Sequence, residues 1–118
     1  EEAYIDKHCE KNDMLNTFAA VIRFNRAISY VMEYACYHPN TFVLITADHE
    51  TGGITPDNTG TFQYTTKSHT PSDVPIFAFG KGAEVFDGAN IENTQIPKTI
   101  AKIWGVADFG DPTQPPAL

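Results

Sequence analysis

The chain has 118 residues, of which 42% are hydrophobic and 12% aromatic, so its size fits one domain with enough apolar material for a core. Its 15 acidic and 8 basic residues give a formal net charge of −7. This balance argues against a general nucleic-acid binder and against binding to an anionic membrane surface, because both need clustered lysine and arginine. The longest apolar run, residues 41–47, is far shorter than the roughly 20 residues of a membrane span.

The first long predicted element is a helix over about residues 13–37. Asn12-Asp13 offers a cap at its start, and Pro39 ends it, because proline disfavours helix at the residue before it. Apolar residues recur inside it at mostly helical spacing and predict a stripe that faces the core: Met14, Phe18, Val21, Ile22, Ile28, Val31, Met32 and Ala35.

Residues 41–47 follow at once as a continuous run of β-formers. Because this run is apolar on both faces, we expect a buried strand with parallel neighbours in a layered sheet. A long helix that feeds such a strand is half of a βαβ unit, so the sequence predicts the α/β class. Residues 61–66 and 74–79 are two further strand candidates, and Pro75 puts the second near a sheet edge or a strand start.

A second helix is expected after Thr94, and the tail 107–118 is expected to be loose, since it carries prolines and no periodicity. Cys9 and Cys36 would lie up to roughly 40 Å apart if the segment between them is one helix. We therefore expect two free thiols.

The strongest chemical feature is Asp48-His49 at the carboxyl end of the predicted strand 41–47. Sheets of the α/β class place their sites at such ends, and an oxygen-plus-imidazole pair suits zinc. The alternative is a helix-capping Asp beside a solvated His. Glu1, Asp6 and Glu10 precede the long helix and are either metal ligands or a solvated acidic helix start.

His69 comes a few residues before the strand 74–79, where it is either a ligand or an ordinary loop histidine. The order of three blocks then resembles the alkaline phosphatase family: Glu1-x-x-x-Ile5-Asp6, Thr46-Ala-Asp48-His49-Glu-Thr-Gly-Gly53, and His69-Thr70. The middle block is highly specific, and the other two gain weight through it. The resemblance implies an alkaline-phosphatase-like three-layer α/β/α fold, with residues 1–106 as a C-terminal part whose sheet is incomplete.

The resemblance also implies two zinc ions and one magnesium ion. Glu1 falls on the magnesium ligand, Asp6 and His69 on ligands of the first zinc, and Asp48 and His49 on ligands of the second. Glu10 stands where the family has a histidine ligand of the first zinc. A carboxylate can ligate zinc, but the extra negative charge changes affinity and metal preference. His8 is a weaker substitute, because its direction from the backbone differs.

The family's serine nucleophile is not recognisable in this chain and is expected upstream. Ser29 is expected in a helix, and Ser68 and Ser72 on a loop, as ordinary polar residues. The resemblance therefore implies an inactive piece of a secreted or periplasmic phosphatase that hydrolyses phosphate monoesters. The parent family is mostly dimeric, and a piece with an exposed sheet edge can also pair with a copy of itself. The short segment 51–68 leaves room for a hairpin in place of a larger inserted subdomain.

Two other interpretations stay open. One is a related metal hydrolase or mutase of the same superfamily, which the extended middle block argues against. The other is a non-catalytic module whose ligands are vestigial, which Glu10 favours.

Overall fold

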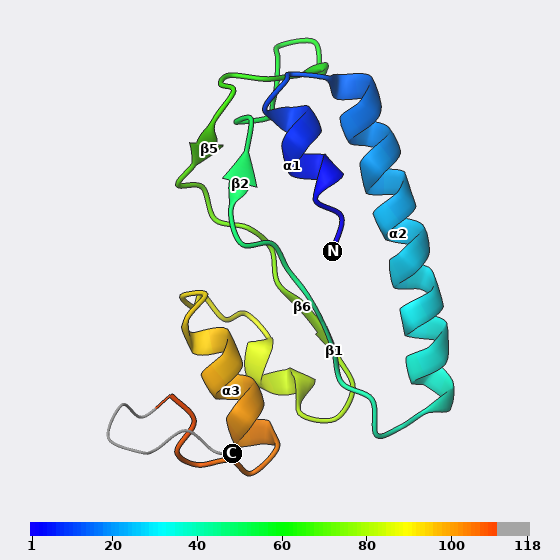
Figure 1. The fold of residues 1–118 in the computed structure, drawn as a ribbon, viewed down its shortest axis with the longest axis vertical. Coiled ribbons are helices and arrows are strands. Elements are labelled where there is room, and N and C mark those ends of the chain that lie inside the picture. The colour runs from blue at the N-terminus through cyan, green and yellow to red at the C-terminus, as the bar shows by residue number, and fades with distance from the viewer. Residues whose placement is uncertain (111–118) are drawn as a thin grey trace.

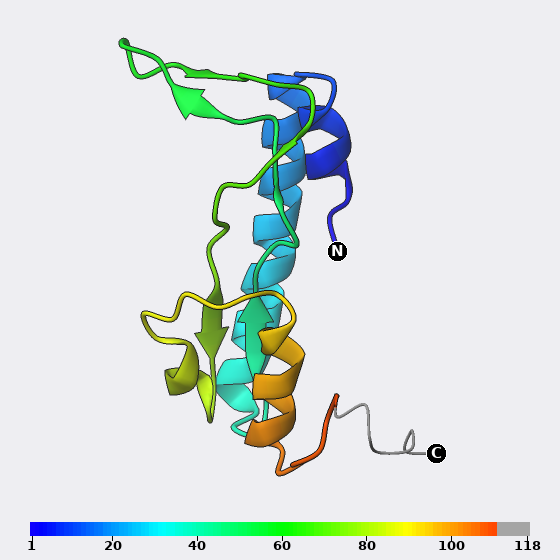
Figure 2. The same ribbon diagram turned by 90° about the vertical axis from the view of Figure 1, so that its left-hand side faces the viewer.

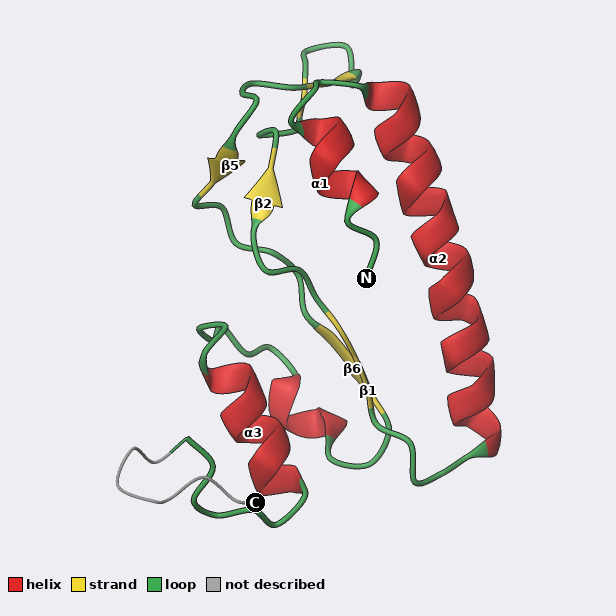
Figure 3. Ribbon diagram, in the orientation of Figure 1, coloured by secondary structure: helices red, strands yellow, loops and turns green. Residues whose placement is uncertain are grey.

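A computed structural model describes residues 1–110 (Figure 1). The elements in chain order are α1 (Tyr4–Cys9), α2 (Met14–Tyr37), β1 (Val43–Ile45), β2 (Glu50–Thr51), β3 (Thr55–Pro56), β4 (Phe62–Gln63), β5 (His69–Thr70), β6 (Phe77–Phe79), the 3-10 helix η1 (Ala83–Phe86) and α3 (Gln95–Ile103). Figure 3 shows how short the strands are beside α2. The predicted helices over 13–37 and after Thr94 are confirmed, and α1 is an additional helix.

Helix α2 begins and ends where the sequence predicts, for local chemical reasons. The side chain of Asp13 accepts the backbone N–H of Asn16 at 3.1 Å, which satisfies a free donor of the first turn. At the other end, Nδ1 of His38 lies 2.7 Å from the carbonyl oxygen of Tyr34, and the two rings stack at 3.7 Å. The ring of His38 thus caps a carbonyl of the last turn.

The described neighbour of β1 is not parallel, as we expected, but antiparallel: β1 pairs with β6, with Val43 opposite Phe79. The ladders β2–β5 and β3–β4 are also antiparallel, and in the sequence they are nested between β1 and β6. Residues 46–76 contain no helix, whereas a parallel return needs a crossover connection. The chain therefore runs out to a hairpin tip and back, and β3–β4 is the hairpin expected in the segment 51–68 (Figure 2).

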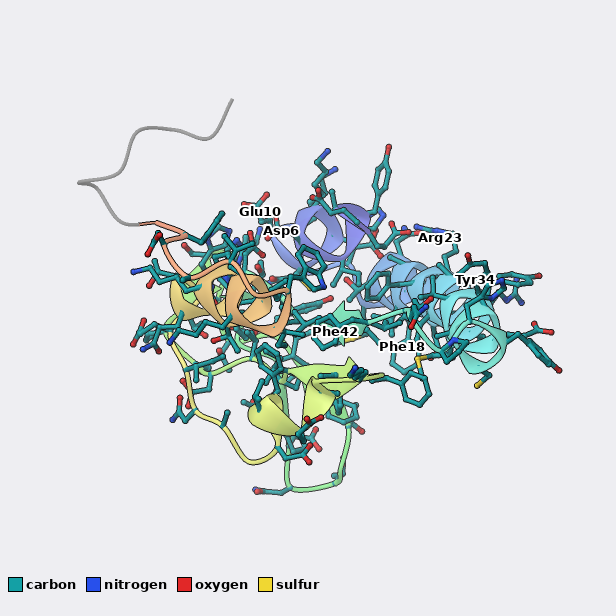
Figure 4. All side chains as sticks on the ribbon, turned by 90° about the horizontal axis from the view of Figure 1, so that it is seen from below. Asp6, Glu10, Phe18, Arg23, Tyr34 and Phe42 are labelled. Carbon is teal, nitrogen blue, oxygen red and sulfur yellow. The ribbon has the colours of Figure 1, made fainter. Side chains whose placement is uncertain are left out.

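The β1–β6 ladder lies between α2 on one side and α3 with η1 on the other (Figures 1 and 2). This order of layers agrees with the predicted α/β/α arrangement. The buried apolar residues are Cys9, Ala20, Ala35, Val43, Phe86 and Ala101. The ring of Phe42, near the middle of Figure 4, packs against Phe86 with centroids 6.0 Å apart.

Much of the predicted apolar stripe of α2 is not buried. Phe18 is 57% exposed, and Val21, Ile22 and Val31 are each between 45% and 49% exposed. The described residues supply only two strands beside this helix, which is too little surface to cover it. The radius of gyration of 17.3 Å also exceeds the roughly 13.5 Å of a compact domain of this length. These observations agree with an incomplete sheet.

Both cysteines are free, as expected, with Cys9 buried and Cys36 exposed. Among the described residues, no helix is both long and apolar enough to cross a membrane. Of the tail 107–118, for which we expected no regular structure, residues 111–118 lie outside the described part of the chain.

Candidate metal centre

Two of the predicted ligands, Asp6 within α1 and Glu10 at its C-cap, lie one turn apart on one face (Figure 4). The position of α1 is fixed against α2 by three contacts. Arg23 of α2 pairs with Glu2 at 3.4 Å, Sγ of Cys9 lies 3.8 Å from Oγ1 of Thr17, and the backbone N–H of Asp13 donates to the carbonyl of His8. These contacts hold Asp6 and Glu10 beside the start of α2.

The turn that follows β1 carries Asp48 and His49 and leads directly into β2, which begins at Glu50. The carboxylate of Glu50 accepts the backbone N–H groups of Gly53 at 3.2 Å and Ile54 at 3.4 Å, and it also accepts the hydroxyl of Thr70. In the β2–β5 ladder, Thr51 lies opposite His69. The ladder therefore brings His69 back beside His49, although 20 residues separate them in the sequence.

Three predicted ligands from three separate segments meet here. One ligand atom each of Asp6, His49 and His69 lies within 4.8 Å of the others. Nε2 of His69 is 3.4 Å from Oδ1 of Asp6, and the two imidazole rings stack with centroids 3.6 Å apart. We call these three residues the metal cluster. Carboxylate oxygens and imidazole nitrogens are both ligands that zinc accepts.

Glu10 adjoins the metal cluster, since its Oε1 lies 3.9 Å from Nε2 of His69. A second carboxylate, besides that of Asp6, is thus within reach of a cation held by His69. His8 contacts a different partner, because its ring stacks on Tyr4 at 5.8 Å and its buried Nδ1 has no hydrogen-bond partner among the described residues. The structure therefore brings Glu10, and not His8, to the position beside His69.

Asp48 and Glu1 lie farther out. The Asp48 side chain is 86% exposed, with Oδ2 3.5 Å from Nε2 of His49, and the side-chain amide of Asn93 donates to the backbone carbonyl of Asp48 at 2.7 Å. Glu1 is exposed, and lines a cavity of 960 Å³ together with Asp6, Asp48 and His49. A second cavity, of 610 Å³, is lined by Asp48, His49 and Thr70 among others. The Asp48-His49 pair therefore lines both cavities.

Sequence reasoning did not assign a role to Thr51. Its hydroxyl donates to Oδ1 of Asp6 at 2.6 Å and lies 3.2 Å from Nδ1 of His49. The residue is part of the Thr-Ala-Asp-His-Glu-Thr-Gly-Gly block, but this contact depends on α1 packing against β2. The block itself was the only signal in the sequence that could have pointed to Thr51.

Tyr64 connects Gly52, the residue after β2, to helix α2. Its hydroxyl donates to Oγ1 of Thr17 in α2 at 2.7 Å, and its ring lies against Gly52. Burial raises the pKa of Tyr64 above its ordinary value, an effect that the hydrogen bond to Thr17 offsets in part. The neutral phenol therefore links α2 to the segment that carries His49.

Comparison with known proteins points to one group of enzymes. The family model of the metalloenzyme superfamily matches residues 3–107. Streptomycin-6-phosphate phosphatase of Streptomyces griseus is 26% identical over 90% of this chain and 28% of its own length. The alkaline phosphatase of the Antarctic bacterium TAB5 matches with a TM-score of 0.79 and 31% identity over 87% of this chain and 33% of its own.

A mutant of the TAB5 enzyme with magnesium bound in its M3 site matches with a TM-score of 0.78 and 28% identity, over 87% of this chain and 34% of its own. The fold of the described chain is therefore alkaline-phosphatase-like. The chain spans about a third of the length of these relatives.

Proposed function

The chain belongs to the metalloenzyme superfamily, and from this we propose that it provides divalent-metal ligands to a phosphoric monoester hydrolase of the alkaline phosphatase type. The observation that carries the proposal is the convergence of Asp6, His49 and His69 from three segments. Phosphate monoesters are the proposed substrate class, supported by the names of the phosphatases that the chain resembles.

In this proposal Asp6, Glu10 and His69 hold one zinc ion, Asp48 and His49 hold the second, and Glu1 contributes to a magnesium site. The distances that support the first set are 3.4 Å from His69 to Asp6 and 3.9 Å from His69 to Glu10. For the second set, the support is the 3.5 Å between Asp48 and His49. Bound zinc supplies Lewis acidity, which lowers the pKa of a hydroxyl or water and neutralises charge on a phosphoryl group.

In this scheme the chain's own residues bind the metal ions and hold the ligand side chains in position. Glu50 ties the turn to β5 through Thr70, so that His49 and His69 keep a fixed separation. We propose no nucleophile within this chain. Ser29 lies within α2, where its hydroxyl donates to the carbonyl of Asn25, and Ser68 and Ser72 lie on loops. We therefore expect this chain by itself to be inactive as a phosphatase.

A non-catalytic module with vestigial ligands is the second candidate, and the observation that favours it is Glu10 beside His69. A vestigial site has lost its affinity for zinc, so Glu10→His would restore binding that the natural chain lacks. Tight zinc binding by the natural chain would instead support the first candidate.

The test is zinc stoichiometry by equilibrium dialysis and metal analysis on the 118-residue chain. We expect zinc to be retained by the natural chain and lost in His69→Asn. The matched control is His38→Asn, since His38 lies at the far end of α2 and contacts Tyr34. Absence of zinc from the natural chain, or equal zinc in all three proteins, would overturn the proposal. Turnover of p-nitrophenyl phosphate by the chain would overturn its predicted inactivity.

Two expectations about the whole protein remain proposals. We propose a homodimer for the parent enzyme, with self-association of this chain through its uncovered apolar surface, which includes Phe18 and Phe77. Light scattering measures this directly, and a strictly monomeric chain would contradict it. A secreted or periplasmic location rests on the family resemblance alone, and fractionation of the source cells tests it.

A further inference from the structure

The hydroxyl of Thr51 lies between two candidate metal ligands that belong to different segments. Oγ1 is 2.6 Å from Oδ1 of Asp6 and 3.2 Å from Nδ1 of His49. Thr51 and both partners are half-buried. A hydroxyl has a single proton, and an ionised carboxylate can only accept. The proton of Thr51 is therefore directed to Asp6, and only its lone pairs remain for His49.

Nδ1 of His49 has a second neighbour that can only accept a hydrogen bond. The backbone carbonyl oxygen of Glu50 lies 3.3 Å from Nδ1 of His49, and a carbonyl oxygen can only accept. Both groups around Nδ1 are thus acceptors and together favour a proton on this nitrogen. The carboxylate of Asp48, whose Oδ2 lies 3.5 Å from Nε2, favours the proton on Nε2 instead, so the tautomer depends on both acceptors at Nδ1. In the neutral ring with the proton on Nδ1, Nε2 holds the free lone pair.

We propose that Thr51 is a positioning residue that selects the neutral His49 tautomer with the proton on Nδ1. Nε2 is then the metal-binding atom of His49, and it lies 3.5 Å from Oδ2 of Asp48. The same hydroxyl orients the carboxylate of Asp6 toward His69. One side chain thereby orders ligands from α1 and from the turn after β1. This inference rests on the proposed function, because the selected nitrogen matters only where a cation binds.

The alternative is that Thr51 merely fastens β2 to α1. Thr51→Val removes the hydroxyl at nearly constant shape, Thr51→Ser keeps it, and Thr99→Val is a matched control. Thr99 lies in α3, and its hydroxyl donates only to the backbone carbonyl of Gln95. Circular dichroism establishes that each variant is folded.

The first measurement is ¹⁵N NMR of the histidine rings in the metal-free chain, at a pH where they are neutral. We expect His49 to be protonated on Nδ1 in the natural chain, Thr51→Ser and Thr99→Val, and to become a mixture of tautomers in Thr51→Val. An unchanged tautomer in folded Thr51→Val would overturn the inference, whatever its stability.

The second measurement is zinc affinity by competition with a chelating dye. Loss of such an outer hydrogen bond typically costs about 10- to 100-fold in metal affinity, which is the loss that we expect for Thr51→Val. Thr51→Ser and Thr99→Val should bind like the natural chain, and equal affinity of all four proteins would overturn the inference. If the natural chain binds no zinc, the proposed function fails, while the NMR result still decides the tautomer.

Discussion

Gly52 is the residue where a single added methyl group most directly tests how the turn is built. Its φ of +89° lies in the left-handed region, where a side chain costs about 1–2 kcal/mol. A Cβ atom there would lie 2.7 Å from Cδ1 of Tyr64 and 3.3 Å from Cβ of Cys9. The tyrosine ring cannot move freely, because its hydroxyl is bonded to Thr17. Such overpacking costs about 1–3 kcal/mol more.

We therefore expect Gly52→Ala to lower the free energy of unfolding by about 2–5 kcal/mol. The control is Gly60→Ala, because Gly60 has a φ of +82° but no atom within 4 Å of the added Cβ. Its cost should be limited to the backbone part, about 1–2 kcal/mol. Urea unfolding followed by circular dichroism measures both. Equal losses in the two variants would refute the packing that we describe around Gly52.

The same substitution should also weaken the metal cluster. The backbone N–H of Gly52 donates to the carbonyl of Ser68, the residue before His69, and its carbonyl accepts from Thr65. A shift at Gly52 therefore displaces His69 relative to His49. We expect zinc affinity to fall in Gly52→Ala and to stay unchanged in Gly60→Ala.

Three further predictions concern Glu10, Tyr64 and Asp13. Glu10→His should raise zinc affinity relative to manganese, because imidazole suits zinc better than a second carboxylate does; competition titrations with no change in that ratio would argue against Glu10 as a ligand. One of the 5 tyrosines should ionise above the usual pKa of about 10 in an absorbance titration, and this step should vanish in Tyr64→Phe. Because folding favours the neutral phenol, Tyr64 contributes its full stabilisation below the ordinary tyrosine pKa, and this stabilisation declines as the pH rises through the raised pKa of the folded state. Titration of all tyrosines at the ordinary pKa would contradict this prediction. Hydrogen bonds from Asn16 lower the pKa of Asp13, so the ionised carboxylate stabilises the fold above its ordinary pKa of 3.8, and this stabilisation is lost as the pH falls through the lowered pKa. Asp13→Ala should therefore lower the urea midpoint at neutral pH and have a smaller effect in acid. An equal effect at both pH values would count against the helix cap.

The parts of the fold that are encoded locally could be predicted. Helix α2 follows from Asp13 at its start and Pro39 after its end, both of which act within a few residues. The direction of β1 could not be predicted, because a continuous apolar run carries no information about its partner. Exposure of Phe18 was also out of reach, since burial depends on what packs over a helix and periodicity records only which residues share a face.

The candidate site likewise contains residues that the sequence alone could identify and one that it could not. Asp6, His49 and His69 were identified because their residue types and order resemble a known motif, and the structure brings these three together. Thr51 was missed because its partner Asp6 is 45 residues away, and only the packing of α1 beside β2 creates the contact.

Crystals of the 118-residue chain grown with zinc, and measured at the zinc absorption edge, would test the central claim most directly. The chain has 4 histidines, and two of them, His8 and His38, lie outside the metal cluster. We predict an anomalous peak between the carboxylate of Asp6 and the imidazole of His69. A peak at His8 or His38 instead, or no ordered zinc near Asp6, would contradict the account.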